Sequence, residues 1–297
     1  MSMIDIVIPS AGRPQDLLRL LDSIHAQCPR SRPAHAASIT VTDDRHALNL
    51  GADIAARFPA VNYVCGPARG PAANRNHGAS RGHAEWILFL DDDCYPACDI
   101  IDHYLRHAAA HPEVQVLEGP IHVVGERPNG NHHAPINLNG GYLWSCNFMI
   151  RRSEFERMGG FDECFPHAAL EDCDFMTRLR AHGTPVHFAH DAVVMHPWRS
   201  MSETEIWRQI VGHAIMAEKH PRFAAGWNAL HLLRAMRGRM RQYSVGRFAS
   251  IPLAKYRTVG FDFIAPLVVY AVMRVAPLRR VLYRRYCNSR TRRPAGV

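Results

Sequence analysis

The stretch that decides the fold is Trp86-Ile87-Leu88-Phe89-Leu90-Asp91-Asp92-Asp93, a continuous apolar run closed by three carboxylates. A short apolar run of this length is typical of a strand that is buried on both faces of a sheet. Ligands of open α/β sheets bind outside the carboxyl ends of the strands, where these acids are expected. Carboxylate oxygens suit Mg²⁺ or Mn²⁺, so the stretch predicts a cation site for a phosphorylated ligand. A solvated acidic loop is the alternative.

Strands and helices alternate on both sides of this stretch. Strands are predicted at 4–9, 39–42, 61–64 and 193–195, and helices from Arg13-Pro14, Gly70-Pro71 and Glu171. This alternation predicts an α/β fold with a mostly parallel central sheet and helices on both faces. The segment between Pro120 and Gly141 is rich in Gly, Pro, Asn and His, and it predicts a mobile loop or an irregular β-excursion next to the site.

Composition sets the class of protein. The chain has 297 residues, 47% hydrophobic and 21% charged, enough for one sizeable core or one core with an appended element. No secretory signal is visible at the N-terminus, which predicts a cytoplasmic protein. The eight cysteines form no C-x-x-C pair and are interpreted as reduced thiols.

The charge is divided unevenly along the chain. From His231 to the end there are fifteen Lys/Arg and one acid, Asp262, which gives +14; the first 230 residues hold twenty bases and twenty-six acids, which gives −6, and the sum is +8. Helical patterning begins after about Ser202, so we predict a main domain over 1–202 and a helical, strongly basic extension over 203–297. The apolar run 264–273 has ten residues, short of the roughly twenty that span a bilayer.

Six motifs lie in order across about residues 1–200: Ile8-Pro9 with Arg13-Pro14, Asp43-Asp44, Gly70-Pro71-Ala72-Ala73-Asn74-Arg75-Asn76, Phe89-Leu90-Asp91-Asp92-Asp93, Gly159-Gly160-Phe161-Asp162, and Glu171-Asp172-Cys173-Asp174-Phe175 with Arg178-Leu179. In order and spacing they resemble the family 2 glycosyltransferases of the GT-A fold. The resemblance implies a Rossmann-like catalytic domain over 1–202. It also implies metal-dependent, inverting transfer of a sugar from a nucleoside-diphosphate sugar to a hydroxyl of a glycan or lipid-linked acceptor.

The resemblance assigns the metal site. Asp93 becomes a ligand of Mn²⁺ or Mg²⁺, and Asp91 faces the ribose or the metal. Asp92, on the opposite side of an extended segment, belongs to the donor-binding set or is structural. His196 occupies a position where related enzymes carry a metal-binding histidine, with a structural or acceptor-site histidine as the alternative. Negative charge grows on the departing diphosphate, and such a cation would neutralise it.

The acidic pair after the glycine-rich turn supplies the base in this resemblance. Asp172 is assigned as the general base, which takes the proton of the acceptor hydroxyl. Glu171 orients Asp172 or binds an acceptor hydroxyl. The alternative for Asp172 is capping of the helix that begins there.

Two further groups of residues follow from the resemblance. A carboxylate of the Asp43-Asp44 pair accepts a hydrogen bond from the nucleobase, although Arg45-His46 replaces the small residues usual after it; a UDP-sugar is the favoured donor. An aromatic face stacks on a sugar ring, so Trp144 is assigned to the acceptor side, with a core tryptophan as the alternative. The donor-binding set is Pro9, Arg13, Asp43, Asp44, Arg75, Asp91 and Asp92, and the acceptor-binding set is Trp144 and Asn147.

The arginines of the C-terminal tail are interleaved with apolar residues. Arg279-Arg280, Arg284-Arg285 and Arg290 to Arg293 flank Val281-Leu282-Tyr283, a pattern typical of a helix that lies on an anionic membrane surface. Peripheral attachment to the cytoplasmic face of a membrane would bring the active site to a lipid-linked acceptor. The alternative is docking of the tail on its own acidic catalytic domain. Nucleic-acid binding is not expected, because basic charge alone is no recognition motif.

Two rival functions are weighed against sugar transfer. A sugar-phosphate nucleotidyltransferase would use a lysine-bearing glycine-rich opening, which is not found, and the chain has only two lysines. A catalytically silent, membrane-associated scaffold would be favoured if the metal-site or base acids were missing, but they are present.

Overall fold

The computed structural model describes residues 4–27, 36–45 and 50–288. The chain forms two compact units. The first contains Met1–Val124, Pro135–Asp162 and Asp172–Pro197, and the second contains Gly125–Ala134, Glu163–Glu171 and Trp198–Val297. Two segments from the middle of the chain therefore belong with the C-terminal helices, and the predicted boundary at residue 202 stays a prediction.

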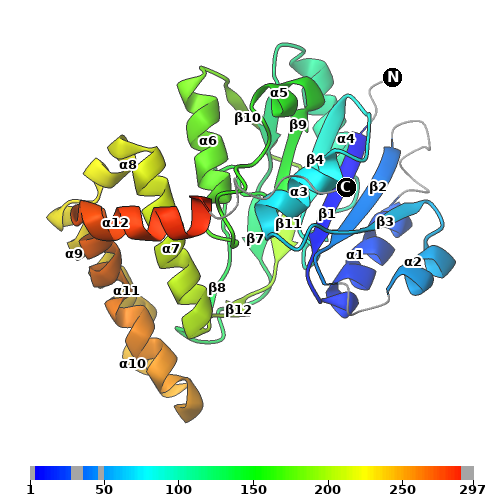
Figure 1. Cartoon of the computed structure of the whole chain (residues 1–297). Helices are drawn as coiled ribbons and strands as arrows, with labels where there is room; N and C mark the ends of the chain where they lie inside the picture. Colours follow the sequence, from blue (N-terminus) through cyan, green and yellow to red (C-terminus); the bar gives the residue numbers. More distant parts are fainter. Residues whose placement is uncertain (1–3, 28–35, 46–49, 289–297) are drawn as a thin grey trace. The chain divides into compact units, whose positions relative to one another are not determined.

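A seven-stranded sheet in the order β10-β6-β9-β4-β1-β2-β3 forms the centre of the first unit (Figure 1). β9 runs antiparallel to β4 and β6, while the other neighbouring strands run parallel. This sheet confirms the predicted α/β class with a mostly parallel sheet. The strands are β1 Ile4–Ser10, β2 Ala36–Asp43, β3 Val61–Cys65, β4 Trp86–Leu90, β6 Val116–Glu118, β9 Asn147–Arg151 and β10 Val186–Phe188.

Helices cover both faces of this sheet, because successive side chains of a buried strand point to opposite faces. In β4, Leu88 packs into one apolar cluster and Phe89 into the other. The Leu88 face is covered by α1 Pro14–Gln27, α2 Gly51–Arg57 and α4 Ile100–Ala110; the Phe89 face is covered by α3 Pro71–Ala79, α5 Arg152–Arg157 and α6 Glu171–Ala181. The apolar run of β4 therefore serves two cores at once.

The order of the strands reverses at β1. From β1 the chain adds β2 and then β3 on one side, and β4 returns to the other side of β1. Ligands of such sheets bind at this switch point, outside the carboxyl ends of the strands. Ser10 ends β1 and Asp91-Asp92-Asp93 follows β4, so the topology brings the acidic motif to this position.

A small second sheet continues directly from the acidic motif. It has the order β5-β11-β7, with β5 Tyr95–Pro96, β7 Ile121–Val123 and β11 Val194–His196. β11 pairs antiparallel with β5, with Val194 opposite Pro96 and Met195 opposite Tyr95. This register carries His196 back to the residues that immediately follow β4.

The second unit is mainly helical, as predicted for the basic extension. The Ser202 side chain and Glu205 form a capping box at the start of α7. The helices are α7 Glu203–Lys219, α8 Pro221–Gly226, α9 Ala229–Gln242, α10 Val245–Ala249, η1 Leu253–Lys255, α11 Tyr256–Arg274, α12 Ala276–Tyr283 and η2 Arg284–Asn288; β8 His132–His133 pairs with β12 Arg199–Ser200.

The apolar run 264–273 is part of a longer helix than its sequence indicated. α11 has 19 residues, and the stretch Leu253–Arg274 is long and apolar enough to cross a membrane by length and composition alone. In that stretch, 44% of the most apolar window is buried inside the protein. The ten-residue run is thus shorter than the helix that contains it, and length and composition alone do not distinguish a core helix from one that crosses a membrane.

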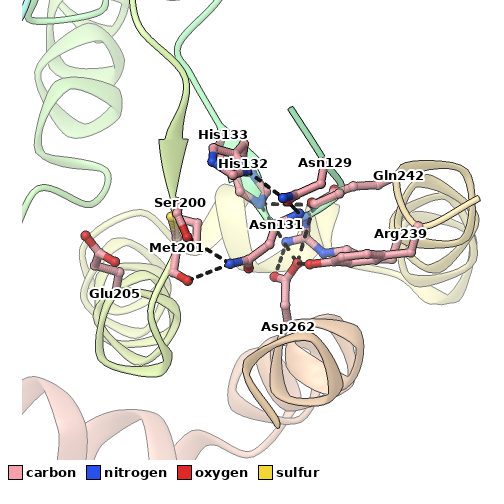
Figure 2. A network of polar contacts seen from close by, with 12 residues as sticks. Asn129, Asn131, His132, His133, Ser200, Met201, Glu205, Arg239, Gln242 and Asp262 are labelled. Carbon is pink, nitrogen blue, oxygen red and sulfur yellow. Dashed lines mark hydrogen bonds and ion pairs between the residues drawn. The ribbon is translucent and has the colours of Figure 1, made fainter. Parts of the chain in front are cut away.

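The buried carboxylate of Asp262 lies within this apolar helix, in the network of Figure 2. Asp262 is 1% exposed and pairs with Arg239 of α9 at 3.1 Å. Tyr243 donates a hydrogen bond to the same carboxylate at 2.6 Å, and Gln242 joins Asp262 to the Gly130 carbonyl. The network thus ties α9, α11 and the 129–133 segment together inside the second unit.

Asp262→Ala should lower the free energy of unfolding by about 3 kcal/mol, because it leaves the Arg239 charge and the Tyr243 hydroxyl without their buried partner. Urea denaturation, monitored by the circular dichroism signal of the helices, measures this loss in the free energy of unfolding. Glu203→Ala is the matched control, since its partner Arg257 is 86% exposed, and it should cost below about 1 kcal/mol. Equal losses in the two variants would contradict the structural role of Asp262.

Candidate active site

Asp92 lies at the centre of the acidic motif and is fully buried. Ser10 donates a hydrogen bond from Oγ to Asp92 at 2.8 Å, and Arg13 forms an ion pair with the same carboxylate. Burial raises the pKa of Asp92 to about 6, although the Arg13 charge opposes the shift. Asp92 therefore joins the end of β1 to the end of β4, which corresponds to the structural alternative for this residue.

Asp91 faces a second guanidinium, that of Arg75, which is buried. Arg75 of α3 lies 2.7 Å from Asp91 Oδ1, and its side chain is 4% exposed. Burial would raise the pKa of Asp91, but the charge and hydrogen bond of Arg75 and the charge of Arg13 outweigh it, so the pKa is lowered and the carboxylate is ionised at neutral pH. Arg75 thus braces the acidic strand end.

Asp93 and His196 form the part of the site that fits a metal. His196 Nε2 lies 3.5 Å from Asp93 Oδ1, and both residues are nearly buried. His196 Nδ1 lies 2.8 Å from the Pro197 carbonyl, a contact that places the ring proton on Nδ1 and directs the Nε2 lone pair toward Asp93. One carboxylate oxygen beside one neutral imidazole is a suitable ligand set for Mn²⁺.

Cys94 belongs to the same cluster, whose ligand atoms lie within 4.8 Å of one another. Burial raises the pKa of the Cys94 thiol far above its usual range, and the thiol donates to the Cys146 carbonyl at 3.8 Å. A protonated, hydrogen-bonded thiol is a poor ligand. The fit to a divalent cation therefore depends on Asp93 and His196.

The acidic motif carries more negative than positive charge. Its three carboxylates face two guanidiniums, Arg13 and Arg75. One negative charge is left over, so the site by itself would repel a diphosphate. A bound divalent cation would reverse this balance.

Asp172 lies at the start of α6 and is 7% exposed. Its Oδ1 accepts a hydrogen bond from the Cys173 backbone N–H at 2.8 Å. The hydrogen bond with Cys94 lowers the pKa of the Cys146 thiol, but burial and the nearby carboxylates Asp91, Asp93 and Asp172 raise it overall. The charges of Asp91, Asp93 and Asp172 thus all act on one thiol, although Asp172 is 79 or more positions from the acidic motif in the sequence.

Glu171 precedes Asp172 in the first turn of α6 and is 3% exposed. Its carboxylate accepts a hydrogen bond from the Ala169 backbone N–H at 2.7 Å. The contact holds the turn that leads into the helix, where Leu170 has a φ of +69°. Glu171 can thereby fix the position of the residue that follows it.

The two acids at the end of β2 have different surroundings. Asp43 is 1% exposed and accepts hydrogen bonds from the Tyr63 hydroxyl and the Arg45 backbone N–H, each at 2.9 Å. Asp44 accepts from the backbone N–H groups of Ala68, at 2.8 Å, and Gly70, at 3.2 Å. Both acids shape the strand ends and the loop that enters α3.

Asn74 and Tyr63, at this edge, were not assigned a role from the sequence. Asn74 accepts from Thr42 Oγ1 at 2.7 Å and donates to the Ser10 and Thr42 carbonyls, which joins the ends of β1 and β2. Tyr63 donates the hydrogen bond to Asp43 described above. Asn76, expected from the sequence to orient the diphosphate, to brace the acidic strand end or to be structural, exchanges two hydrogen bonds with the backbone of Phe161 and so holds the glycine-rich turn. Pro9, of the donor-binding set, is buried in β1 beside Thr42.

A stacked aromatic pair lies on the loop before β9, with Tyr142 exposed and Trp144 partly buried against a core cluster. Trp144 stacks with Tyr142 at 6.2 Å between ring centroids and 11° between planes, and Tyr142 is 59% exposed. The buried Glu118 carboxylate accepts from the backbone N–H groups of Gly141 and Leu143 and thereby holds this loop. Tyr142 and Glu118 were missed in the sequence, because neither belongs to a recognised motif.

Asn147, predicted for the acceptor side, has its side chain hydrogen-bonded inside the protein. It is 1% exposed, its amide donates to the carbonyls of Pro120, at 3.0 Å, and Ala192, at 2.8 Å, and its oxygen accepts from Tyr104 at 2.8 Å. All its polar atoms are thus used inside the protein.

Two curated proteins resemble part of this chain. The chain is 25% identical over 190 residues to an uncharacterized glycosyltransferase of Haemophilus influenzae, and 26% identical over 225 residues to the O-antigen biosynthesis protein RfbC of Myxococcus xanthus. The matches cover 60% and 62% of this chain, but 62% and 16% of the relatives. The chain thus spans less than two thirds of the curated relatives it matches.

A solved structure confirms the fold. The crystal structure of S. aureus TarS matches with a TM-score of 0.55 at 14% identity, over 92% of this chain and 55% of that chain. This likeness confirms the expected GT-A fold. The model of the family "Glycosyl transferase family 2" matches residues 5–175, which include the acidic motif and the Glu171-Asp172 pair. The chain therefore belongs to glycosyl transferase family 2.

Proposed function

We propose that this chain is a metal-dependent, inverting glycosyltransferase that moves a sugar from a nucleoside-diphosphate sugar, with a UDP-sugar favoured, to a hydroxyl of a glycan or lipid-linked acceptor. The observation that carries the proposal is the pairing of Asp93 Oδ1 with His196 Nε2 at 3.5 Å, directly after β4, and the Asp172 carboxylate acts electrostatically on the same region. The name of the relative RfbC, an O-antigen biosynthesis protein, supports an acceptor in polysaccharide assembly.

The donor is held at the switch point of the sheet. Asp93 and His196 hold a divalent cation, Mn²⁺ or Mg²⁺, which when bound neutralises the negative charge on the departing diphosphate. Asp91, fixed by Arg75, orients the ribose. Asp43 and Asp44 lie at the neighbouring strand end, where a carboxylate oxygen accepts from the N–H of a nucleobase.

The acceptor is activated from the other side. Asp172 accepts the proton of the acceptor hydroxyl while the hydroxyl oxygen attacks the anomeric carbon. The bond from that carbon to the diphosphate breaks in the same displacement, so the configuration inverts. Tyr142, which is exposed and stacks on the partly buried Trp144, offers an aromatic surface for the acceptor ring.

A thermal-shift screen tests this function. Nucleoside diphosphates and their sugars, each with and without Mn²⁺, are added to the full chain, because a ligand of the folded state raises its melting temperature. We expect one nucleotide to stabilise the protein, and more strongly with Mn²⁺ present. Stabilisation without turnover of the corresponding sugar donor on any glycan or lipid-linked acceptor would favour the silent scaffold instead.

We propose further that α12 attaches the protein to the cytoplasmic face of an anionic membrane. Leu278 and Val281 are 43% and 63% exposed, next to the exposed Arg280, while Leu282 packs into the core of its own unit. An apolar and basic surface of this kind suits the headgroup region. Arg290 to Arg293, which belong to the predicted membrane-binding tail, lie outside the described residues.

Replacing Arg280, Arg284 and Arg285 together by glutamine should weaken binding to phosphatidylglycerol vesicles about a hundredfold, at about 1 kcal/mol for each arginine. Vesicle flotation of the full chain measures this. Arg234, Arg237 and Arg241 of α9 are also exposed, and their triple glutamine variant is the charge-matched control. Unchanged flotation of the variant that lacks Arg280, Arg284 and Arg285 would end the membrane proposal and leave docking on the chain's own domain as the alternative.

A further inference from the structure

A second group of potential metal ligands lies in the first unit, on α4, on β10 and on the segment after β10. His103 and His107 are four residues apart on α4, so they share one face of the helix, and His111 is the residue that ends it. His187 lies in β10, and His190 and Asp191 follow this strand; His187 and Asp191 both contact His107. None of these residues belongs to the acidic motif or to its neighbours.

The contacts converge on His107. Its Nε2 lies 2.8 Å from Asp191 Oδ1, and its Nδ1 lies 3.0 Å from His187 Nε2. The His190 ring lies edge-on to the His107 ring, with 5.2 Å between centroids. His103 Nδ1 contacts the Asp191 carbonyl at 2.5 Å, which fixes the backbone of the segment to α4.

These contacts define where protons must lie. The Asp191 carboxylate and a neutral imidazole nitrogen both carry lone pairs, so a proton has to bridge the 2.8 Å contact in the metal-free protein. A cation can take the place of that proton. His107 Nδ1–H would then donate to His187, an arrangement that fixes the tautomer of metal-binding histidines.

We propose that His107, His190 and Asp191 form a Zn²⁺ site that is separate from the Asp93–His196 site. One potential ligand atom from each of the three lies within 4.8 Å of the others. Around a tetrahedral zinc, with bonds of about 2.1 Å, neighbouring ligand atoms are about 3.4 Å apart, so small side-chain rotations close the site. Two imidazoles and one carboxylate form a ligand set of zinc sites that keep an open fourth position.

The ligands of this second site favour Zn²⁺ over the Mg²⁺ or Mn²⁺ proposed for the active site. Mg²⁺ and Mn²⁺ prefer oxygen ligands, whereas imidazole nitrogen suits Zn²⁺. His187 Nε2 lies 3.0 Å from His107 Nδ1, so the His187 ring is placed to accept the Nδ1 proton of a zinc-bound His107. Arg106 lies 3.5 Å from Asp191 and opposes a cation, but its side chain is 66% exposed and can turn into solvent.

Isothermal titration of the untagged full chain with zinc chloride tests the proposal. We expect one zinc equivalent to remain bound in His196→Asn, where the other candidate site has lost its imidazole. His107→Gln with His190→Ala should weaken zinc binding by at least about a hundredfold, since it removes two of three ligands. Zinc should also raise the melting temperature of the wild type, but not that of the double variant.

The controls separate loss of the site from loss of the fold. His25→Ala with His83→Ala removes two exposed histidines elsewhere in the first unit and should leave zinc affinity unchanged. His190 is itself exposed, so His190→Ala alone keeps the fold if the double variant does not. Unchanged zinc affinity in the His190 and double variants, or complete loss of zinc binding in His196→Asn, would overturn the proposal.

Discussion

Asp93→Ala should lower the turnover of sugar transfer by about a thousandfold or more, because it removes a ligand of the proposed cation and with it the stabilisation of the leaving diphosphate. Asp93 is 2% exposed, and its Oδ1 lies 3.5 Å from His196 Nε2. The loss should appear in kcat. Steady-state kinetics at several Mn²⁺ concentrations measure it.

Two further variants make this result specific. Asp93→Asn keeps the size of the side chain but removes its charge, so we expect a higher Mn²⁺ requirement together with the lower kcat. Asp22→Ala removes an acid that is 55% exposed and paired with Arg57, and it should leave kcat unchanged. Wild-type turnover and metal dependence in both Asp93 variants would exclude Asp93 as a ligand.

Asp172→Asn should lower kcat by a factor of about 10² to 10⁴, which is the range that a positioned general base contributes. Binding of the nucleotide donor should not change, because the variant loses only the acceptor of a proton. Quenched-flow measurement of a single turnover, together with the thermal shift caused by the donor, distinguishes chemistry from binding.

The same variant also tests the capping alternative. Asp172 Oδ1 accepts the Cys173 N–H, and the amide oxygen of asparagine can accept it equally well. If capping were the whole role of Asp172, the asparagine variant would be nearly as active as the wild type. Glu171→Gln should have a smaller effect than Asp172→Asn, since its proposed role is to position the base.

The sequence was sufficient for the elements that depend on local pattern. The strand before Asp91, the helix after Arg13-Pro14 and the helix from Glu171 were predicted because hydrophobic periodicity and strand-end acids are local signals. The position of Asp91-Asp92-Asp93 at the mouth of the sheet followed from the rule for strand ends.

Other features depend on contacts between distant segments. Asn147 was assigned to the acceptor side, but the strand it begins turns its amide inward to the Pro120 and Ala192 carbonyls. The run 264–273 was judged by its own length, whereas α11 also includes the more polar turn that precedes it and buries Asp262 in a network from other helices. The partners of Asn147 and of Asp262 lie far from these two residues in the sequence.

The sequence by itself determined the α/β class, the order of the motifs and the acids available for chemistry. These features depend on side-chain periodicity and chain direction, which are local properties of neighbouring residues. Tertiary structure alone decided which of these groups meet. The antiparallel register of β11 on β5 brings His196 to Asp93, and the packing of α4 against the segment after β10 brings His107 to Asp191. Pairing between distant strands and helices is set by the shared cores, and no local pattern encodes it.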